Sequence, residues 1–322
     1  MNNKKNLVII TGPTAVGKTA VSVEVAKKLN GEIISADSMQ VYRNMDIGTA
    51  KVTREEMQGI RHYMIDEFEP DDEFNVTIFK DKARTYIDEI SERGRLPIIA
   101  GGTGFYIQSV LYDVDFSEYS EEDRLKLHEE LMAEYEIKGA DVMFEKLREI
   151  DPVYAGIIHK NNTRRVIHGI EFYMLTGRRI SEHNDEQREK ESPYDFLYFV
   201  LTDDRDRLYE RINKRVDKMI DDGLVEEVRR LLEHGYSTEL PSMLGLGYKE
   251  TADYLNGLCT LDEAVEIIKR DTRHFAKKQL TWFKRERDVI YIPRDGRSNS
   301  EIADDIIERI HEKISKKVLT GR

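Results

Sequence analysis

Short strand-like runs alternate with longer amphipathic segments through the first hundred residues of the chain. Runs at residues 7–10, 32–35 and 97–100 each end in glycine or small polar residues, and segments of helical length separate them. Buried strands joined by helices give this pattern, so it predicts βαβ units and a parallel sheet covered by helices. Open sheets of this kind bind ligands at the carboxyl ends of their strands, and we expect a site there.

The pattern changes in the middle of the chain. A charged, helical stretch follows residue 115, and residues 196–201 return to a strand pattern. Residues 205–222 predict a long amphipathic helix that stops at Gly223. Two or three more helices, a strand at 289–292 and a final charged helix follow. We therefore predict two domains. Residues 1–115 and 196–322 form a core domain, and residues 116–195 form an inserted all-helical domain.

Composition narrows the class of protein. Hydrophobic residues make up 39% and charged residues 35% of the 322 positions, which is typical of a helix-rich soluble protein. The apolar run at residues 7–10 is far shorter than the roughly 18 residues of a membrane span or the h-region of a secretory signal, so we expect a cytoplasmic protein without a membrane partner. The single cysteine, Cys259, excludes an intramolecular disulfide and a multi-cysteine zinc site.

Charge is unevenly distributed along the chain. The net charge of −12 argues against a nucleic-acid partner, because such binding uses Lys and Arg against phosphates. However, residues 115–149 carry twelve Asp and Glu against five Lys and Arg, which is more than half of the excess. Residues 269–287 carry eight Lys and Arg against two acids. This basic segment is either a solvated helix face or a surface for an anionic partner.

The strongest motif is a P-loop between the first predicted strand and the helix after it. The sequence GPTAVGKT matches the pattern GxxxxGK[ST]. The amides of the loop and the dipole of the following helix are suited to binding phosphate oxygens. Lys18 can offset the phosphate charge, and the Thr19 hydroxyl can bind Mg²⁺. The motif predicts a P-loop NTPase-like α/β fold and a polyphosphate ligand, whether ATP, GTP or a diphosphate ester. The residues of this predicted site are Gly12, Pro13, Thr14, Ala15, Val16, Gly17, Lys18 and Thr19.

Two further loops follow strands at the same edge of the predicted sheet. The segment ADSMQVY places Asp37 after the second strand, where it could hold Mg²⁺ through water, act as a general base or cap a helix. The segment GGTG at residues 101–104 follows the strand at 97–100, and a helix N-cap at Thr103 explains it as well as a ligand contact does.

With GPTAVGKT, ADSMQVY and GGTGFY in this order, the chain resembles the tRNA dimethylallyltransferases, also called tRNA isopentenyltransferases. The likeness continues in NNTRR, LTGR, RINKR, GLVEEV, GYKE and QLTWF and spans about residues 7–292. The resemblance implies transfer of a dimethylallyl group from its diphosphate to N6 of the adenosine just 3′ of the anticodon (tRNA position 37). The lone cysteine rules out the zinc finger of eukaryotic relatives, so the bacterial type is the better match.

The resemblance also implies roles for individual residues. Asp37 would be the general base, Thr103 would orient the amine or a phosphate, and Lys18 and Arg215 would stabilise the leaving diphosphate together with Mg²⁺ at Thr19. The partners would be dimethylallyl diphosphate and the anticodon stem-loop of tRNA, bound by a monomer. The implied tRNA contacts are Asp37, Ser38, Met39, Gln40, Thr103, Arg124, Arg164, Arg165, His168, Gly247, Tyr248, Lys249, Arg273, Lys277, Lys278 and Gln279.

One departure and three alternatives accompany this interpretation. Where relatives commonly have an arginine three residues after Arg165, this chain has His168, which predicts a weaker or pH-dependent phosphate contact. The alternatives are a P-loop small-molecule kinase that uses ATP, an isopentenyltransferase acting on free AMP or ATP, and a non-catalytic RNA-binding protein. A large helical insertion and a basic helix make little sense for an acceptor as small as AMP.

Overall fold

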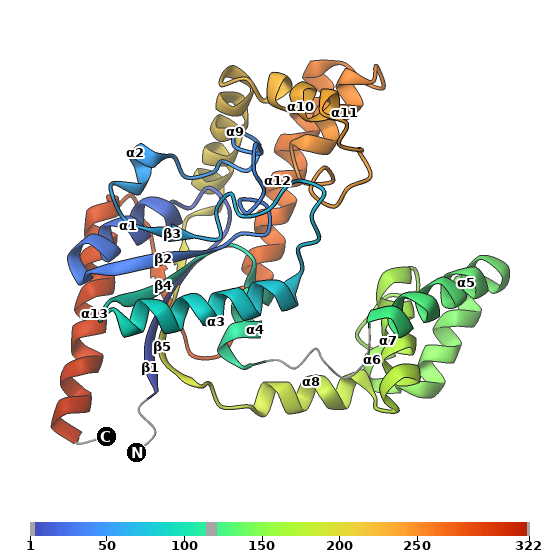
Figure 1. The fold of residues 1–322 in the computed structure, drawn as a ribbon, viewed down its shortest axis with the longest axis horizontal. Coiled ribbons are helices and arrows are strands. Elements are labelled where there is room, and N and C mark those ends of the chain that lie inside the picture. The colour runs from blue at the N-terminus through green and yellow to red at the C-terminus, as the bar shows by residue number, and fades with distance from the viewer. Residues whose placement is uncertain (1–3, 114–120, 321–322) are drawn as a thin grey trace. The chain divides into compact units, whose positions relative to one another are not determined.

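In a computed structural model, which describes residues 4–113 and 121–320, the chain forms a parallel sheet covered by helices (Figure 1). The sheet has the strand order β3-β2-β4-β1-β5-β6, and every pairing is parallel. The predicted α/β class is confirmed. The sequence pattern missed β3, which has only two residues. The strands are β1 (Lys5–Thr11), β2 (Gly31–Ala36), β3 (His62–Tyr63), β4 (Leu96–Gly101), β5 (Tyr194–Thr202) and β6 (Val289–Pro293).

Helices pack on both faces of the sheet. Helices α1 (Lys18–Leu29) and α13 (Asn299–Thr320) contact each other, and α1 also contacts β4 and β2. Helix α3 (Val76–Glu92) contacts β1, β2 and β4 and buries Phe79, Ala83, Ile87 and Ile90. The remaining helices of this part of the chain are α2 (Arg54–Met57), α4 (Gly104–Leu111), α9 (Arg205–Asp221), α10 (Leu224–Glu233), α11 (Tyr248–Leu255) and α12 (Leu261–Phe283).

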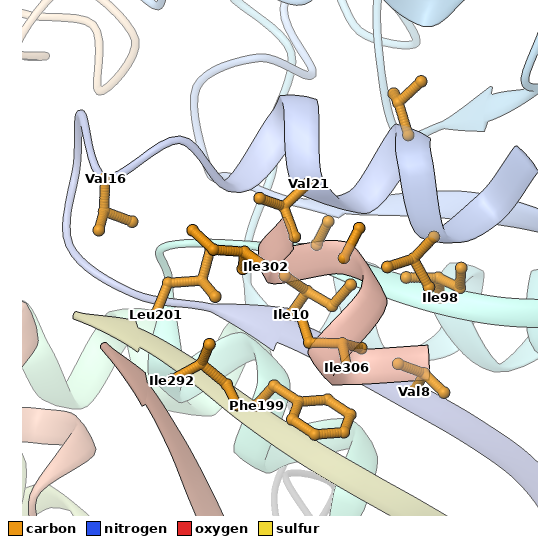
Figure 2. Close-up of a cluster of buried hydrophobic side chains, with 14 of the residues drawn as sticks. Val8, Ile10, Val16, Val21, Ile98, Phe199, Leu201, Ile292, Ile302 and Ile306 are labelled. Atoms are coloured by element: carbon orange, nitrogen blue, oxygen red, sulfur yellow. The ribbon is translucent and has the colours of Figure 1, made fainter. Parts of the chain in front are cut away.

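The main hydrophobic core lies between the sheet and α1 and α13 (Figure 2). Val8 and Ile10, two residues apart on β1, share this face because side chains alternate along a strand. The intervening Ile9 is also buried, so the strand is apolar on both faces, as expected for a central strand of a parallel sheet. Other members of this core are Val16, Val21, Ile98, Phe199, Leu201, Ile292, Ile302 and Ile306.

The described chain divides into two compact units. Unit 1 combines Met1–Val110 with Tyr194–Arg322, and unit 2 is Leu111–Pro193. We predicted an insertion at residues 116–195, and its start lies outside the described residues. Within its described residues unit 2 contains only helices: α5 (Glu121–Ile150, interrupted at Gly139), α6 (Pro152–Ala155), α7 (Thr163–Thr176) and α8 (Ile180–Glu189).

Unit 2 has its own hydrophobic core. Leu131, Met143 and Leu147 of α5 pack with Val166 and Ile170 of α7, and all five are buried. Of the helices described in either unit, none is both long enough and apolar enough to cross a membrane.

Candidate active site

Three strands that lie side by side in unit 1 end at the loops in which we predicted the site. Thr11 of β1 and Ala36 of β2 both pair with Gly101 of β4, so the carboxyl ends of the three strands are level. The Thr11 hydroxyl donates a hydrogen bond to the Gly101 carbonyl (2.6 Å), and the Thr103 amide donates to the Ala36 carbonyl (3.1 Å). The P-loop, Asp37 and the loop at 101–104 therefore adjoin one another.

Two glycines allow the P-loop to take its shape. Gly12 has φ +148°, and a Cβ there would lie 2.4 Å from the Leu201 carbonyl oxygen, so only glycine fits against β5. Gly17 has φ +95° and is the N-cap residue of α1. Between them Val16 is fully buried in the main core and anchors the loop. The loop is thus held by packing as well as by its backbone conformation.

Lys18 is folded back over its own loop. Its Nζ donates hydrogen bonds to the carbonyl oxygens of Gly12 (3.1 Å) and Pro13 (2.9 Å). Burial lowers the pKa of the Lys18 ammonium to about 8, Asp37 acts in the opposite direction, and Arg215 lowers it further. An anionic ligand in the site would restore the charged form.

A cavity of about 380 Å³ lies against these loops. Its lining carries four cations and a single acidic side chain, Asp37, among the described residues. Arg211 and Lys214 belong to this lining although we did not predict them. The spacing on α9 is the signal: Arg211 precedes Lys214 by three residues and Arg215 by four, and residues three and four apart share a helix face. The lining consists of Thr14, Ala15, Gly17, Lys18, Thr19, Asp37, Gln40, Ala50, Gly102, Arg211, Lys214, Arg215, Phe275 and Gln279.

Asp37 lines this cavity and interacts electrostatically with two of its cations, Lys18 and Arg215. Its Oδ1 accepts a hydrogen bond from the Met39 amide (3.0 Å), which is the local turn that aspartate commonly makes. Burial lowers the pKa of the Arg215 guanidinium, while the charges of Asp37 and Glu56 raise it. Since a carboxylate has two oxygens, the turn leaves Asp37 with capacity to accept a proton or a hydrogen bond from a ligand.

The loop at residues 46–50 accepts hydrogen bonds from two side chains that line the cavity, Gln40 and Arg215. Gln40 Nε2 donates to the carbonyl oxygens of Ala50 (3.2 Å) and Thr49 (3.4 Å). Arg215 Nη2 donates to the same Thr49 carbonyl (3.4 Å). The carbonyl oxygens of this loop therefore fix the side-chain directions of both residues. Because the Gln40 amide already bonds within the protein, its role as a reader of the base stays a prediction.

Glu227, a buried carboxylate of α10, orders this loop. Its Oε2 accepts from the amides of Asp46 (3.0 Å) and Ile47 (2.8 Å), and its Oε1 accepts from the amide of Gly48 (3.1 Å) and the hydroxyl of Tyr248 (2.6 Å). Four donors offset the desolvation of the charge. This role could not be predicted from the sequence, since an acidic residue on an amphipathic helix usually faces water.

Replacing Glu227 by glutamine is expected to lower the free energy of unfolding by about 3 kcal/mol, because the amide NH₂ would face backbone donors. Loss of the activity of the site should accompany the loss of stability, since Gln40 and Arg215 depend on the same loop. Glu226→Gln is the matched control: Glu226 is adjacent, exposed and bonded to Arg229 on the surface. Urea unfolding of the two variants checks this, and equal midpoints would contradict the assigned role.

Oxygen donors of the kind that bind a magnesium ion line a smaller cavity next to the site. A second cavity, of about 40 Å³, shares Lys18, Thr19, Asp37 and Gln40 with the larger one and adds Ser22 and Ser35, in a lining that brings hydroxyls and a carboxylate together. Across residues 4–113 and 121–320, no group of three or more His, Cys, Asp or Glu side chains could hold a metal. The hydroxyls and the carboxylate of this lining are oxygen donors of the kind that Mg²⁺ takes together with substrate phosphates.

Thr103 occupies the turn between β4 and α4. Its carbonyl oxygen accepts hydrogen bonds from the amides of Tyr106 (3.0 Å) and Ile107 (3.3 Å). The backbone of Thr103 therefore begins the helix, in agreement with the N-cap that we predicted as one explanation of this loop. Its neighbour Gly102 lines the larger cavity, Thr103 itself is not part of that lining, and its contact with a ligand stays a prediction. The N-cap geometry and the proposed role are compatible, because one uses the backbone and the other the side chain.

The expected tRNA contacts of unit 1 divide into exposed and buried side chains. Lys277, Lys278 and Lys249 are exposed. Arg273 of α12 donates to Asn213 of α9 (2.6 Å) and is half-buried. Near the site, Ser38 is half-buried and Met39 packs against the hydrophobic cluster that contains Tyr248, so apolar contact dominates there.

The side chains of Tyr248 and Gln279, two of the expected tRNA contacts, bond within the protein, and their role in tRNA binding stays a prediction. Tyr248 is fully buried and bonds to Glu227, and Gln279 is 7% exposed and bonds to two loops of the site. Desolvation and the bond to Glu227 raise the pKa of the Tyr248 hydroxyl well above its usual range. Gly247 precedes α11 with φ +94° and leaves Lys249 as the exposed side chain of this turn.

The expected contacts of unit 2 lie on α5 and α7. Arg164 and Arg165 are exposed in the first turn of α7, after the N-cap residue Asn162. His168 is exposed one turn later, and its Nδ1 lies 4.0 Å from the buried carboxylate of Glu171. Arg124 lies near the start of α5 and is half-buried.

Comparison with known proteins gives consistent matches over most of the chain. A family model described as IPP transferase matches residues 40–286. A tRNA dimethylallyltransferase of Lachnoclostridium phytofermentans is 57% identical over 308 residues, which are 95% of this chain and 98% of the relative. The crystal structure of a tRNA isopentenylpyrophosphate transferase from Bacillus halodurans is 43% identical, with a TM-score of 0.75 over 99% of both chains. A eukaryotic dimethylallyltransferase acting on tRNA is 29% identical, with a TM-score of 0.82 over 99% of this chain and 80% of the other.

Proposed function

The chain belongs to the IPP transferase family, and from this premise we propose that it transfers a dimethylallyl group from dimethylallyl diphosphate to N6 of the adenosine directly 3′ of the tRNA anticodon. The products are N6-(dimethylallyl)adenosine in tRNA and free diphosphate. Relatives named for this activity match nearly the full length of the chain, which supports the assignment.

The observation that carries the proposal is that a P-loop, four cations and one carboxylate line the same cavity. Lys18, Arg211, Lys214 and Arg215 line the cavity together with Asp37. Prenyl transfer requires both functions, because diphosphate leaves as an anion while the amine loses a proton. A volume of about 380 Å³ is in the range of cavities that bind small molecules.

In the proposed reaction the bond between C1 of the dimethylallyl group and the diphosphate oxygen breaks, and the electron pair leaves with diphosphate. The P-loop amides, Lys18 and Arg215 stabilise the charge that develops on the leaving group. The adenine N6 forms the new bond to C1 and releases its proton to Asp37. Thr103, in the loop next to the P-loop, orients the amine. The adenine leaves its stack in the anticodon loop to reach the cavity.

Mg²⁺ is part of the proposal. Bound by the Thr19 hydroxyl with Asp37 nearby, it would neutralise charge on the diphosphate. The oxygen donors that line the smaller cavity support this site. Removal of divalent cations with EDTA should abolish transfer, and added Mg²⁺ should restore it; undiminished transfer in EDTA would contradict the metal site.

Transfer of label from radioactive dimethylallyl diphosphate tests the function. Unmodified tRNA, AMP and ATP are offered as acceptors in parallel reactions with Mg²⁺. We expect label in tRNA alone and, after nuclease digestion, in the adenosine next to the anticodon. Label in AMP or ATP would show a free-nucleotide isopentenyltransferase instead, and absence of label from all three would contradict prenyl transfer.

A further inference from the structure

Gln279 of α12 joins the P-loop to the loop at residues 101–104. Its Oε1 accepts a hydrogen bond from the Thr14 amide (2.8 Å), and its Nε2 donates to the Gly102 carbonyl (3.0 Å). The side chain is only 7% exposed and lines the 380 Å³ cavity. One amide group therefore bonds at the same time to the loop expected to hold diphosphate and to the loop expected to hold the reacting amine.

A second contact from the same helix acts on the same loop. Trp282 stands three residues after Gln279, so the two side chains share a face of α12. The Trp282 ring lies directly on Gly104, where an added Cβ would be 2.3 Å from it, and it meets Phe105 edge to face with centroids 6.1 Å apart. Thr103 is thus bracketed: Gln279 holds the residue before it and Trp282 covers the residue after it.

These contacts argue against Gln279 as a reader of RNA bases. Both ends of its amide are bonded inside the protein, and a base contact would break a bond to one of the two loops. By contrast, its neighbours Lys277 and Lys278 are exposed on the same helix and are available for phosphates. Helix α12 therefore has an outer basic face and an inner face that touches the reaction site.

We infer that Gln279 is a positioning residue that sets the distance between the P-loop and Thr103, and so between the donor diphosphate and the acceptor amine. This inference rests on the proposed transfer reaction. A reaction between two bound substrates depends strongly on their alignment, and a misplacement of about 1 Å costs on the order of 10²-fold in rate. The Gln279 bridge should therefore act on kcat more than on the binding of either substrate.

Gln279→Met tests this, because methionine has a similar length and no amide. We expect kcat to fall about 30- to 100-fold, while KM for tRNA changes by less than about threefold. The affinity for inorganic diphosphate, measured by calorimetry, should stay equal or increase, because the Thr14 amide is released toward the cavity. If Gln279 read a base, its replacement would instead raise KM for tRNA. If it only stabilised the fold, its replacement would lower the melting temperature without lowering kcat selectively.

Gly102→Ala provides a second route to the same disruption, and it serves if the methionine variant does not fold. An added Cβ would lie 2.3 Å from Gln279 Nε2, the mobile end of the side chain, and would displace it. We expect kcat to fall about tenfold, a smaller misplacement than that of the methionine variant. The double variant should be no slower than Gln279→Met alone, since both changes break one bridge.

Thr281→Val is the matched control on the same helix. Thr281 is exposed and its hydroxyl donates to the Lys277 carbonyl one turn earlier, so its replacement should leave kcat and KM for tRNA within about twofold. The inference is overturned if Gln279→Met keeps kcat within about threefold of the unaltered protein, or if the losses of Gln279→Met and Gly102→Ala multiply in the double variant. Failure of the unaltered protein to transfer label in the same assay would instead count against the proposed function.

Discussion

Replacing Asp37 by asparagine is expected to lower kcat about 10²- to 10⁴-fold, the usual contribution of a general base. Asparagine retains an oxygen that can accept the Met39 amide, so the turn after β2 should persist. It cannot take up the proton that N6 releases. Single-turnover transfer from labelled dimethylallyl diphosphate measures the chemical step, and filter binding measures tRNA affinity, which should change by less than about threefold.

A matched control and a metal titration separate the roles of Asp37. Glu56 also acts on Arg215 electrostatically, but it does not line the cavity, so Glu56→Gln should leave kcat within about twofold. If Asp37 serves as base, saturating Mg²⁺ will not restore the asparagine variant. Recovery of kcat at high Mg²⁺ would show that Asp37 holds the metal instead, and a large loss of tRNA affinity would show a binding role.

The parts of the fold that the sequence predicted are those with a strong local pattern. The strands at 7–10, 32–35 and 97–100 are short apolar runs between helical segments, and the structure contains all three as neighbours in the sheet. Strand β3 was missed because two residues carry no periodicity. Its place at the edge of the sheet depends on pairing with Ile33 and Ile34 of β2, which is a tertiary contact.

The site shows the same division between local and tertiary signals. The P-loop was predictable because its glycines and Lys18 lie in one short motif with one mechanism. In the sequence, Gln279 follows two lysines of a basic segment, and Glu227 is one of several acidic residues on an amphipathic helix. Each of the two contacts a loop more than 170 residues away in sequence. Side chains whose partners are so distant leave no local pattern, so buried polar residues of this kind were either assigned to the surface or overlooked.

Replacing Lys18 by methionine is expected to lower kcat/KM for dimethylallyl diphosphate about 10²- to 10³-fold, since a preorganised donor to the leaving group is removed. Stability should not fall. Because burial lowers the pKa of Lys18, folding disfavours its charged form, and an apolar side chain of similar length relieves that cost. A thermal melt therefore separates the functional effect from unfolding, and a variant that is less stable and equally active would contradict the assignment.

The pH dependence of the unaltered protein tests the same residue without mutation. Burial lowers the pKa of Lys18 to about 8, so the protein loses this cation as pH rises through 8 before diphosphate binds. Diphosphate favours the charged form once bound, which raises the pKa in the complex. We therefore expect kcat/KM for dimethylallyl diphosphate to decline above pH 8, about tenfold per pH unit, while kcat at saturation stays level. The decline should be absent in Lys18→Met, and a decline of equal size there would assign it to another group.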